Sequence, residues 1–310
     1  MKAAQITSYD GPEAVTVNDV ETPELAPNQV LITAVAAGVN PFDWKVTLGY
    51  AKDWVPLTFP ATLGGDVAGT ISQLGAEVTG FEVGQAVYGS ANSLSGNGAF
   101  AELVPVDSDK IAPAPASIDL HAAAGYPLAA ASAYQSLVDT AKIQAGQKVL
   151  IHGGAGGIGS MAIQMAKNAG AYVATTAGAE DLDYVTSLGA DEAIDYKSQD
   201  FSTLLTGYDV VFDTVGGETY KKSFEVLKEG GQLVSMVEQP DEALATEHKV
   251  AAKHMMTGAS TATLTEITAL IDAGKLSVNI DKEFPLDEAA AALAHSKNGH
   301  VRGKVIITIA

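Results

Sequence analysis

A glycine-rich turn in the middle of the chain has the spacing of a nucleotide-binding loop. Gly154, Gly156 and Gly159 follow directly after the apolar segment 148–152 and give the pattern G-x-G-x-x-G. In such a loop the first glycine permits a tight turn, the second lets a diphosphate approach the backbone, and the third lets a helix pack closely on a strand. The amides that open this helix then bind the phosphates. We therefore expect a dinucleotide to contact Gly154, Ala155, Gly156, Gly157, Ile158 and Gly159.

The residues after the loop support this interpretation, because apolar side chains recur there at helical spacing. They are Ile158, Met161, Ala162, Met165, Ala166 and Ala169. This spacing predicts a helix with one buried face that begins where the loop requires it. Gly170 then ends the helix before a β-branched segment, 172–176.

The end of that second strand indicates which nucleotide is bound. Enzymes that use NAD usually place Asp or Glu there to bind the ribose 2′-hydroxyl, whereas this chain has Thr175 and Thr176 followed by small residues. A neutral strand end does not repel a 2′-phosphate, so we expect NADPH at this position, with NADH as the alternative. Glu180 and Asp181 follow shortly after, where they also suit the start of the next helix.

Length, composition and net charge indicate a globular protein and argue against several classes of partner. A chain of 310 residues with 47% hydrophobic residues predicts two globular domains. The net charge of −19 argues against nucleic acid or an anionic membrane as a partner. Because no signal-like start or long apolar run occurs, we expect a cytoplasmic protein. The absence of cysteine excludes disulfides, thiol nucleophiles and thiolate metal sites.

Two patterns of elements should position these residues. Residues 1–117 carry short alternating segments, typical of an irregular β domain. After Gly146 strands and helices alternate, which predicts a doubly wound parallel sheet. The expected strands are 148–152, 172–176, 193–195, 209–213 and 232–236, and the expected helices 158–169, 182–188 and 221–227. Helices over 264–273 and 287–294 and a β-rich ending, 304–309, complete the chain. We expect 1–117 and 263–310 to form one domain, with 118–262 inserted as the other.

Seven segments in the same order resemble the zinc-independent quinone oxidoreductase branch of the medium-chain dehydrogenase/reductase superfamily. They are GVNPFDWK at 38–45, GGDVAG at 64–69, GAFAE at 98–102, PLAAASAY at 127–134, the glycine loop, LGAD at 188–191 with IDY at 194–196, and DTVGG at 213–217. The resemblance implies an α/β fold in which a Rossmann sheet is inserted in a mostly β, GroES-like catalytic domain. It also implies a homodimer.

The zinc-dependent relatives, as the resemblance implies, hold a catalytic metal with a cysteine at the position of Asn40, a histidine at that of Gly65 and a further cysteine near Leu128. This chain has none of these side chains, so we expect no metal. Without a Lewis acid, hydride must go to an acceptor that is already activated. We therefore expect hydride transfer from NADPH to a quinone or an α,β-unsaturated carbonyl.

The resemblance also assigns side chains in the substrate site. It implies that Asn40 orients the substrate carbonyl or the nicotinamide ribose, that Asp43 maintains the geometry of the site, and that Tyr50 stacks on the substrate or donates a proton. Asp43 also suits a turn after Pro41, and Tyr50 an aromatic at the rim.

On the cofactor side, the resemblance places Ser132 near the nicotinamide and Tyr196 and Arg302 toward the phosphate, and it counts Val215 among the residues that bind the cofactor. Ser132 also suits a helix cap, and Tyr196 an exposed strand end.

Other chemistry has less support in the sequence. The six histidines lack a shared spacing for a metal, and no G-x-S-x-G elbow occurs. Two alternatives stay open: a 2-enal or enoyl-thioester reductase of the same superfamily, and a cofactor-binding protein without turnover.

Overall fold

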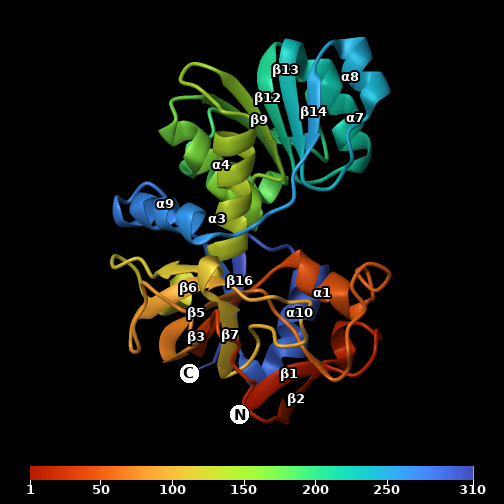
Figure 1. Cartoon of the computed structure of the whole chain (residues 1–310). Coiled ribbons are helices and arrows are strands. Elements are labelled where there is room, and N and C mark those ends of the chain that lie inside the picture. Colours follow the sequence, from red (N-terminus) through yellow and green to blue (C-terminus); the bar gives the residue numbers. More distant parts are fainter. Residues whose placement is uncertain (310) are drawn as a thin grey trace. The chain divides into compact units, whose positions relative to one another are not determined.

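The computed structural model describes residues 1–309, and these group into two compact units (Figure 1). The first unit consists of residues 1–128, 259–274 and 278 onward, and the second of residues 129–258 and 275–277. The two termini therefore fold together, and the middle of the chain forms a unit of its own.

Ten strands build two sheets in the first unit. The larger sheet has the order β15-β16-β3-β5-β6-β8, with β7 also paired to β3, and the smaller has the order β2-β1-β4. β3 is eleven residues long and pairs with three strands, so it is the centre of the larger sheet. The strands are β1 (Lys2–Ile6), β2 (Thr16–Asp19), β3 (Gln29–Val39), β4 (Ala61–Thr62), β5 (Asp66–Leu74), β6 (Ala86–Ser90), β7 (Leu103–Asp107), β8 (Ile111–Pro113), β15 (Ile280–Pro285) and β16 (Lys304–Thr308).

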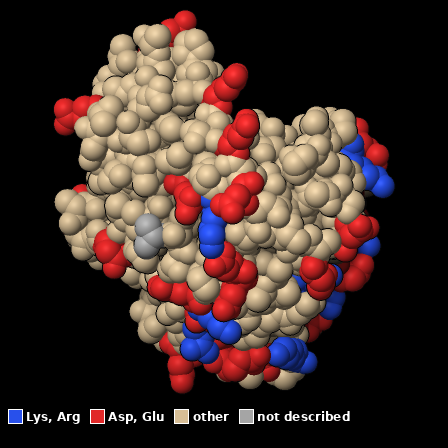
Figure 2. Space-filling model, turned by 90° about the horizontal axis from the view of Figure 1, so that it is seen from below, with Lys and Arg blue, Asp and Glu red and all other residues tan. Residues whose placement is uncertain are grey.

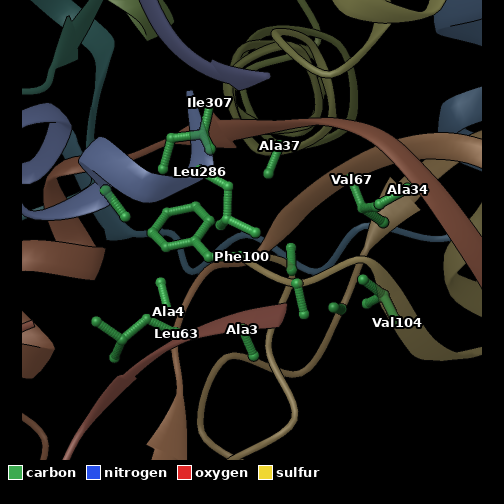
Figure 3. Packing of buried hydrophobic residues seen from close by; sticks show 14 of the residues in the cluster. Ala3, Ala4, Ala34, Ala37, Leu63, Val67, Phe100, Val104, Leu286 and Ile307 are labelled. Atoms are coloured by element: carbon green, nitrogen blue, oxygen red, sulfur yellow. The ribbon is translucent and has the colours of Figure 1, made fainter. Parts of the chain in front are cut away.

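The core of the first unit lies between these strands. The ring of Phe100 is fully buried and packs among aliphatic side chains from both ends of the chain, including Ala4, Leu63 and Leu286 (Figure 3). Ile307 of β16 belongs to the same cluster, so the C-terminal strand completes a core that the first hundred residues begin.

The helices of the first unit are short except for the last two. They are α1 (Pro41–Thr47), α2 (Leu120–Ala123), α9 (Thr261–Asp272) and α10 (Ala289–Asn298), with 3-10 turns at Pro12–Ala14, Ser108–Lys110 and Leu286–Glu288. Ser260 caps α9, because its hydroxyl accepts the Thr263 amide at 3.2 Å.

The second unit is built on one parallel sheet of order β11-β10-β9-β12-β13-β14. All neighbouring strands in it are parallel, and their order is that of a Rossmann fold with the first strand at the centre. The strands are β9 (Lys148–His152), β10 (Tyr172–Ala177), β11 (Glu192–Asp195), β12 (Tyr208–Asp213), β13 (Leu227–Ser235) and β14 (Ala251–His254). β14 is an edge strand that the sequence pattern did not predict.

Helices cover the sheet of the second unit. In Figure 1, α4 lies on one side of the strands and α7 and α8 lie on the other. The helices are α3 (Pro127–Tyr134), which starts in the first unit and continues as a π-helix over Gln135–Thr140, α4 (Gly157–Asn168), α5 (Leu182–Ser187), α6 (Phe201–Leu204), α7 (Gly217–Val226) and α8 (Glu242–His248), with a 3-10 turn at Ala179–Asp181. The predicted fold class, a Rossmann sheet inserted in a mostly β domain, is confirmed.

The unit boundaries differ from the expected 117/118 and 262/263, because side chains tie both junctions to the first unit. The Leu128 amide donates to Asp66 at 3.0 Å, and the Thr261 hydroxyl donates to the carbonyls of Ser108 and Ile111. Gln164 bonds Ser277 and thereby draws residues 275–277 into the second unit.

The excess of acidic residues is visible on the surface. On the face shown in Figure 2, red Asp and Glu side chains are more widespread than blue Lys and Arg. Within residues 1–309, none of the helices has the length and apolar character needed to cross a bilayer.

Candidate functional site

The glycine loop joins β9 to α4 in the second unit, and its tight turn runs from Gly153 to Gly156. Gly153 has a φ of +71°, in the left-handed region, whereas Gly154 has no positive φ. The amide of Gly156 donates to the Gly153 carbonyl at 3.1 Å and closes the turn. Gly154 and Ala155 are thus the central residues of this turn, and Gly153 adds a left-handed residue directly after His152.

Close packing also requires glycine at positions 154 and 159. A Cβ atom on Gly154 would lie 2.1 Å from the Thr175 hydroxyl, and one on Gly159 would lie 2.2 Å from the Gly153 carbonyl oxygen. The absence of both side chains lets α4 approach β9 and β10, as expected for the third glycine.

Gly156 leaves the start of α4 open. It is the N-cap residue, no side chain caps the helix there, and the first turn carries no acidic residue. A Cβ on Gly156 would meet only the Gly153 carbonyl oxygen, at 3.5 Å. Free amides and a helix dipole with no protein anion beside them are what a diphosphate needs, so this cradle fits the phosphates of a dinucleotide.

Thr175 and Thr176 support the loop from β10. The Thr175 hydroxyl donates to the Ile151 carbonyl at 2.7 Å. The Thr176 hydroxyl accepts the Gly153 amide at 3.3 Å and lies 3.1 Å from the His152 ring. Both threonines are buried, so in this structure their hydroxyls hold the strand and the turn in place.

Ser132 and Val215 also belong to the second unit. Ser132 is fully buried, and its hydroxyl lies 2.5 Å from that of Thr257. Val215 is exposed in the loop after β12, where its amide donates to Asp213 at 3.0 Å. Thr214 of this loop bonds the His152 carbonyl at 2.9 Å, so the structure brings Val215 close to the glycine loop.

A cation that the sequence analysis missed lies at the ends of β10 and β11. Lys197 follows Tyr196 and donates to Glu180 at 3.0 Å, and its ammonium lies 5.8 Å from the centre of the Tyr196 ring. Tyr196 is well exposed. Neighbouring parallel strands end at the same edge of a sheet, and this rule would have brought Lys197 to the end of β10. The carboxylate near that strand end is thus paired with an ammonium.

In the first unit, three strand ends meet at a buried polar cluster, which we call the Asn40 cluster: Asn40, Asp43, Asp66 and Lys304. Val305 pairs with Val39 and Gly38 pairs with Asp66, so the start of β16, the end of β3 and the start of β5 lie side by side. The cluster is buried by the strand register and not by a local motif.

Hydrogen bonds define each member of this cluster. Lys304 donates to Asn40 Oδ1 at 2.5 Å and to Asp66 Oδ2 at 3.3 Å. Asn40 Nδ2 donates to Asp66 Oδ2 at 2.9 Å. The other oxygen of Asp66 accepts the Leu128 amide. Burial raises the pKa of Asp66, and the ammonium of Lys304 opposes that rise.

Asp43 caps the helix that follows Asn40. Pro41 is the first residue of α1, and the Asp43 carboxylate accepts the Asn40 amide at 2.7 Å, which is the return half of a capping box. Segment 41–47 is thus a helix and not the turn that was the alternative for Asp43. Burial, reinforced by the charge of Asp66, raises the pKa of Asp43 to about 7, against the Asn40 hydrogen bond and Lys304.

Tyr50 lies after α1 on the surface of the first unit. It is 60% exposed and packs edge-on against Trp54, with ring centres 5.8 Å apart. The Lys45 ammonium lies 5.6 Å from the ring centres of both Tyr50 and Trp44. Tyr50 is thus exposed, as expected for an aromatic residue at the rim of a site, and the Lys45 ammonium lies near its ring.

Arg302 belongs to the first unit, whereas Tyr196 belongs to the second. The Arg302 backbone is tied to Asp281 at 3.2 Å and to Asn279 at 2.7 Å. Because the two residues lie in different units, neither unit by itself joins them into the expected phosphate site.

The positions expected for metal ligands do converge, but their side chains do not fit zinc. Asn40 and Leu128 both bond Asp66, which is next to Gly65. Zinc prefers thiolate, imidazole and carboxylate, and here the Asp66 carboxylate is bonded to an ammonium and the Asp43 carboxylate to the Asn40 amide. Among residues 1–309 there is no group of three or more His, Cys, Asp or Glu side chains that could hold a metal ion.

Asp66 and Lys304 were missed as members of this site. Both lie in segments that the sequence analysis singled out, the 64–69 motif and the C-terminal strand. Their meeting depends on the pairing of β16 with β3 and of β3 with β5, which no local pattern encodes.

Two family models match the chain. One, described as alcohol dehydrogenase GroES-like domain, covers residues 26–116, and the other, described as zinc-binding dehydrogenase, covers residues 188–307. The chain is similar to a chloroplastic NADPH-dependent alkenal/one oxidoreductase of Arabidopsis thaliana, at 35% identity over 99% of this chain and 79% of the relative. It is also similar to a 2-methylene-furan-3-one reductase of Solanum lycopersicum, at 34% identity with the same coverage.

A solved structure, the quinone oxidoreductase from Coxiella burnetii, superposes with a TM-score of 0.93. The two chains are 32% identical, over 100% of this chain and 99% of the other. The likeness therefore spans both units.

Proposed function

Because the chain belongs to the quinone oxidoreductase-like branch of the medium-chain dehydrogenase/reductase superfamily, we propose that it transfers hydride from NADPH to a conjugated acceptor. The acceptor is a quinone or the carbon–carbon double bond of an α,β-unsaturated carbonyl. The names of the two curated relatives support this class, since an alkenal, an alkenone and a methylene-furanone all place such a bond beside a carbonyl.

The nucleotide cradle supports NADPH as the cofactor. The open N-terminus of α4 suits the diphosphate, and Gly156 leaves room for it. At the ends of β10 and β11, Lys197 offers an ammonium to a 2′-phosphate, and its bond to Glu180 offsets the charge of that carboxylate. The bound nucleotide supplies the hydride.

The observation that carries the substrate class is the composition of the Asn40 cluster. The positions where a zinc site would need thiolate or imidazole carry Asn40, Gly65 and Leu128. The neighbouring Asp66 carboxylate is bonded to the Lys304 ammonium, so we infer zinc-independent chemistry. Such a site supplies hydrogen-bond donors and not a Lewis acid. A conjugated acceptor suits it, because its carbonyl needs only stabilisation of the negative charge that develops on oxygen.

Asn40 is the donor that we assign to this oxygen. Its Nδ2 gives one hydrogen to Asp66, and its second hydrogen has no partner among residues 1–309. Tyr50 is assigned to contact the body of the substrate, for which its exposed ring is suited. Asp43 keeps Asn40 at the start of α1.

The proposal is tested by following NADPH oxidation with 1,4-benzoquinone, 9,10-phenanthrenequinone, a medium-length 2-enal and an enoyl thioester, with NADH in parallel. We expect turnover with a quinone or the enal and a preference for NADPH. Turnover of the thioester alone would favour the enoyl-thioester reductase, and NADPH binding with no turnover would favour a binding protein.

The substrate assignments are tested by Asn40→Ala and Tyr50→Phe. Loss of the donor should lower kcat by about 100-fold, in line with the removal of one oxyanion donor. Loss of the Tyr50 hydroxyl should lower kcat less if the ring only stacks. Unchanged turnover in both variants would refute the assignments.

A further inference from the structure

The orientation of the Asn40 amide is fixed from both ends by a buried ion pair. Oδ1 faces the Lys304 ammonium, which can only donate, and Nδ2 faces the Asp66 carboxylate, which accepts. If the amide were turned by 180°, its oxygen would face the carboxylate and its nitrogen the ammonium. Both contacts would then be repulsive. The pair therefore permits one of the two orientations that an asparagine side chain ordinarily allows.

The ion pair between Lys304 and Asp66 carries a desolvation cost, so its presence in the core needs an explanation. Lys304 is 3% exposed and Asp66 is fully buried. Removing two charges from water carries a large desolvation cost that their mutual attraction must offset, and a protein in which apolar residues replace a buried pair is often no less stable. A specific orientation of a polar group is one use for which such pairs are kept.

We propose that Lys304 is a positioning residue for the reaction: together with Asp66 it holds the Asn40 amide so that the free hydrogen on Nδ2, and not Oδ1, meets the carbonyl oxygen of the substrate. This inference rests on the proposed function, because it assigns Asn40 to that oxygen. It assigns no contact between Lys304 and the substrate.

The test separates orientation from stability with four variants. Lys304→Met leaves Asp66 buried without its cation, and we expect it to lose both stability and kcat. The double variant Lys304→Met with Asp66→Asn removes both charges, so its stability should recover in part. The amide introduced at position 66 could still bond Asn40 in either orientation, so we expect kcat to stay about 10- to 100-fold below wild type, with the KM for NADPH unchanged.

Two further variants serve as references. Lys304→Arg keeps the cation and should retain more kcat than the methionine variant. Lys2→Met removes an exposed ion pair with Asp287 in the same unit and should leave kcat unchanged. A double variant as active as wild type would overturn the proposal, because the amide would then need no ion pair.

A spectroscopic measurement decides the question if the wild type reduces no conjugated acceptor. In protein labelled with ¹⁵N at asparagine, the Asn40 side-chain amide is identified by its loss in Asn40→Ala. We expect its two protons to give distinct signals in the wild type, and the proton bonded to Asp66 to exchange slowly there and faster in the double variant. Equal exchange in both would refute the positioning role, independently of whether the proposed reaction occurs.

Discussion

At the scale of single residues, Asp43 shows how burial couples a helix cap to pH. Its carboxyl holds the Asn40 amide, yet burial raises its pKa to about 7. In the unfolded chain the pKa of an aspartate is about 3.9, so the folded state binds a proton more tightly. The stability that the protonated form contributes is present below about pH 4 and is lost as pH rises toward 7.

The variant Asp43→Asn tests this coupling, because an amide oxygen still accepts the Asn40 amide and carries no charge. From pH 5 to pH 8 the free energy of unfolding of the wild type should fall by about 3 kcal/mol more than that of the variant, because only the wild-type carboxyl loses a proton in this range. Urea unfolding at both pH values measures the difference. If the two proteins differ equally at both, the carboxyl of Asp43 does not titrate in this range.

Two glycines of the nucleotide loop allow a second prediction at this scale. An added methyl group would have space at Gly156 but would clash with another side chain at Gly154. Gly156→Ala finds open space at the start of α4, so it should fold normally but weaken NADPH binding by 10-fold or more, since its methyl group would occupy the diphosphate position. Gly154→Ala meets the Thr175 hydroxyl and should lower stability as well.

Thermal unfolding and calorimetry distinguish the two effects. Gly258→Ala is the matched control in the same unit, because its Cβ would meet nothing within 4 Å. It should leave both stability and binding unchanged. If Gly156→Ala bound NADPH as tightly as this control, the diphosphate would not lie at the start of α4.

At the scale of elements, the ends of β10 and β11 form the edge where the 2′-phosphate is recognised in our proposal. Lys197→Ala should weaken NADPH by about 10-fold relative to NADH, because one charge-assisted hydrogen bond to phosphate is lost. Lys221→Ala, which breaks a comparable exposed pair with Glu218, is the control. An equal loss of affinity for both nucleotides would contradict this role for Lys197.

Elements with a strong local period could be predicted from the sequence, and long-range pairing could not. The strand 148–152 and the helix after it were expected within one residue, because apolar spacing and glycines mark both. The Asn40 cluster was predicted only in part. Asn40 and Asp43 stand in one motif, but Lys304 reaches them across 264 positions of sequence, through the register of β16 on β3.

Local sequence patterns also did not predict the conformation of each glycine or the hydrogen-bond partners of the threonine hydroxyls. The motif indicated the turn that contains Gly154, but it did not single out Gly153 as the residue with a left-handed conformation. Thr175 and Thr176 were expected to bind the nucleotide, and that stays a prediction. The sequence did not indicate that the Thr175 hydroxyl bonds the neighbouring strand and the Thr176 hydroxyl the turn. Side-chain partners of this kind depend on tertiary packing.

At the scale of the whole molecule, the nucleotide cradle and the proposed substrate residues belong to different units. The second, a continuous Rossmann unit apart from residues 275–277, carries the nucleotide cradle. The first, assembled from both ends of the chain, carries the Asn40 cluster and Tyr50. In our proposal, the nucleotide binds the second unit and residues of the first unit contact the conjugated acceptor.

The most direct test of this account is the fate of a labelled hydride. NADPH that carries deuterium at the transferred position of C4 is incubated with the enzyme and an α,β-unsaturated ketone, and the product is analysed by mass spectrometry and NMR. We predict a saturated ketone with one deuterium on the carbon β to the carbonyl. An allylic alcohol with deuterium on the carbonyl carbon would contradict the account, because it would show that hydride is added to the carbonyl group and not to the carbon–carbon double bond.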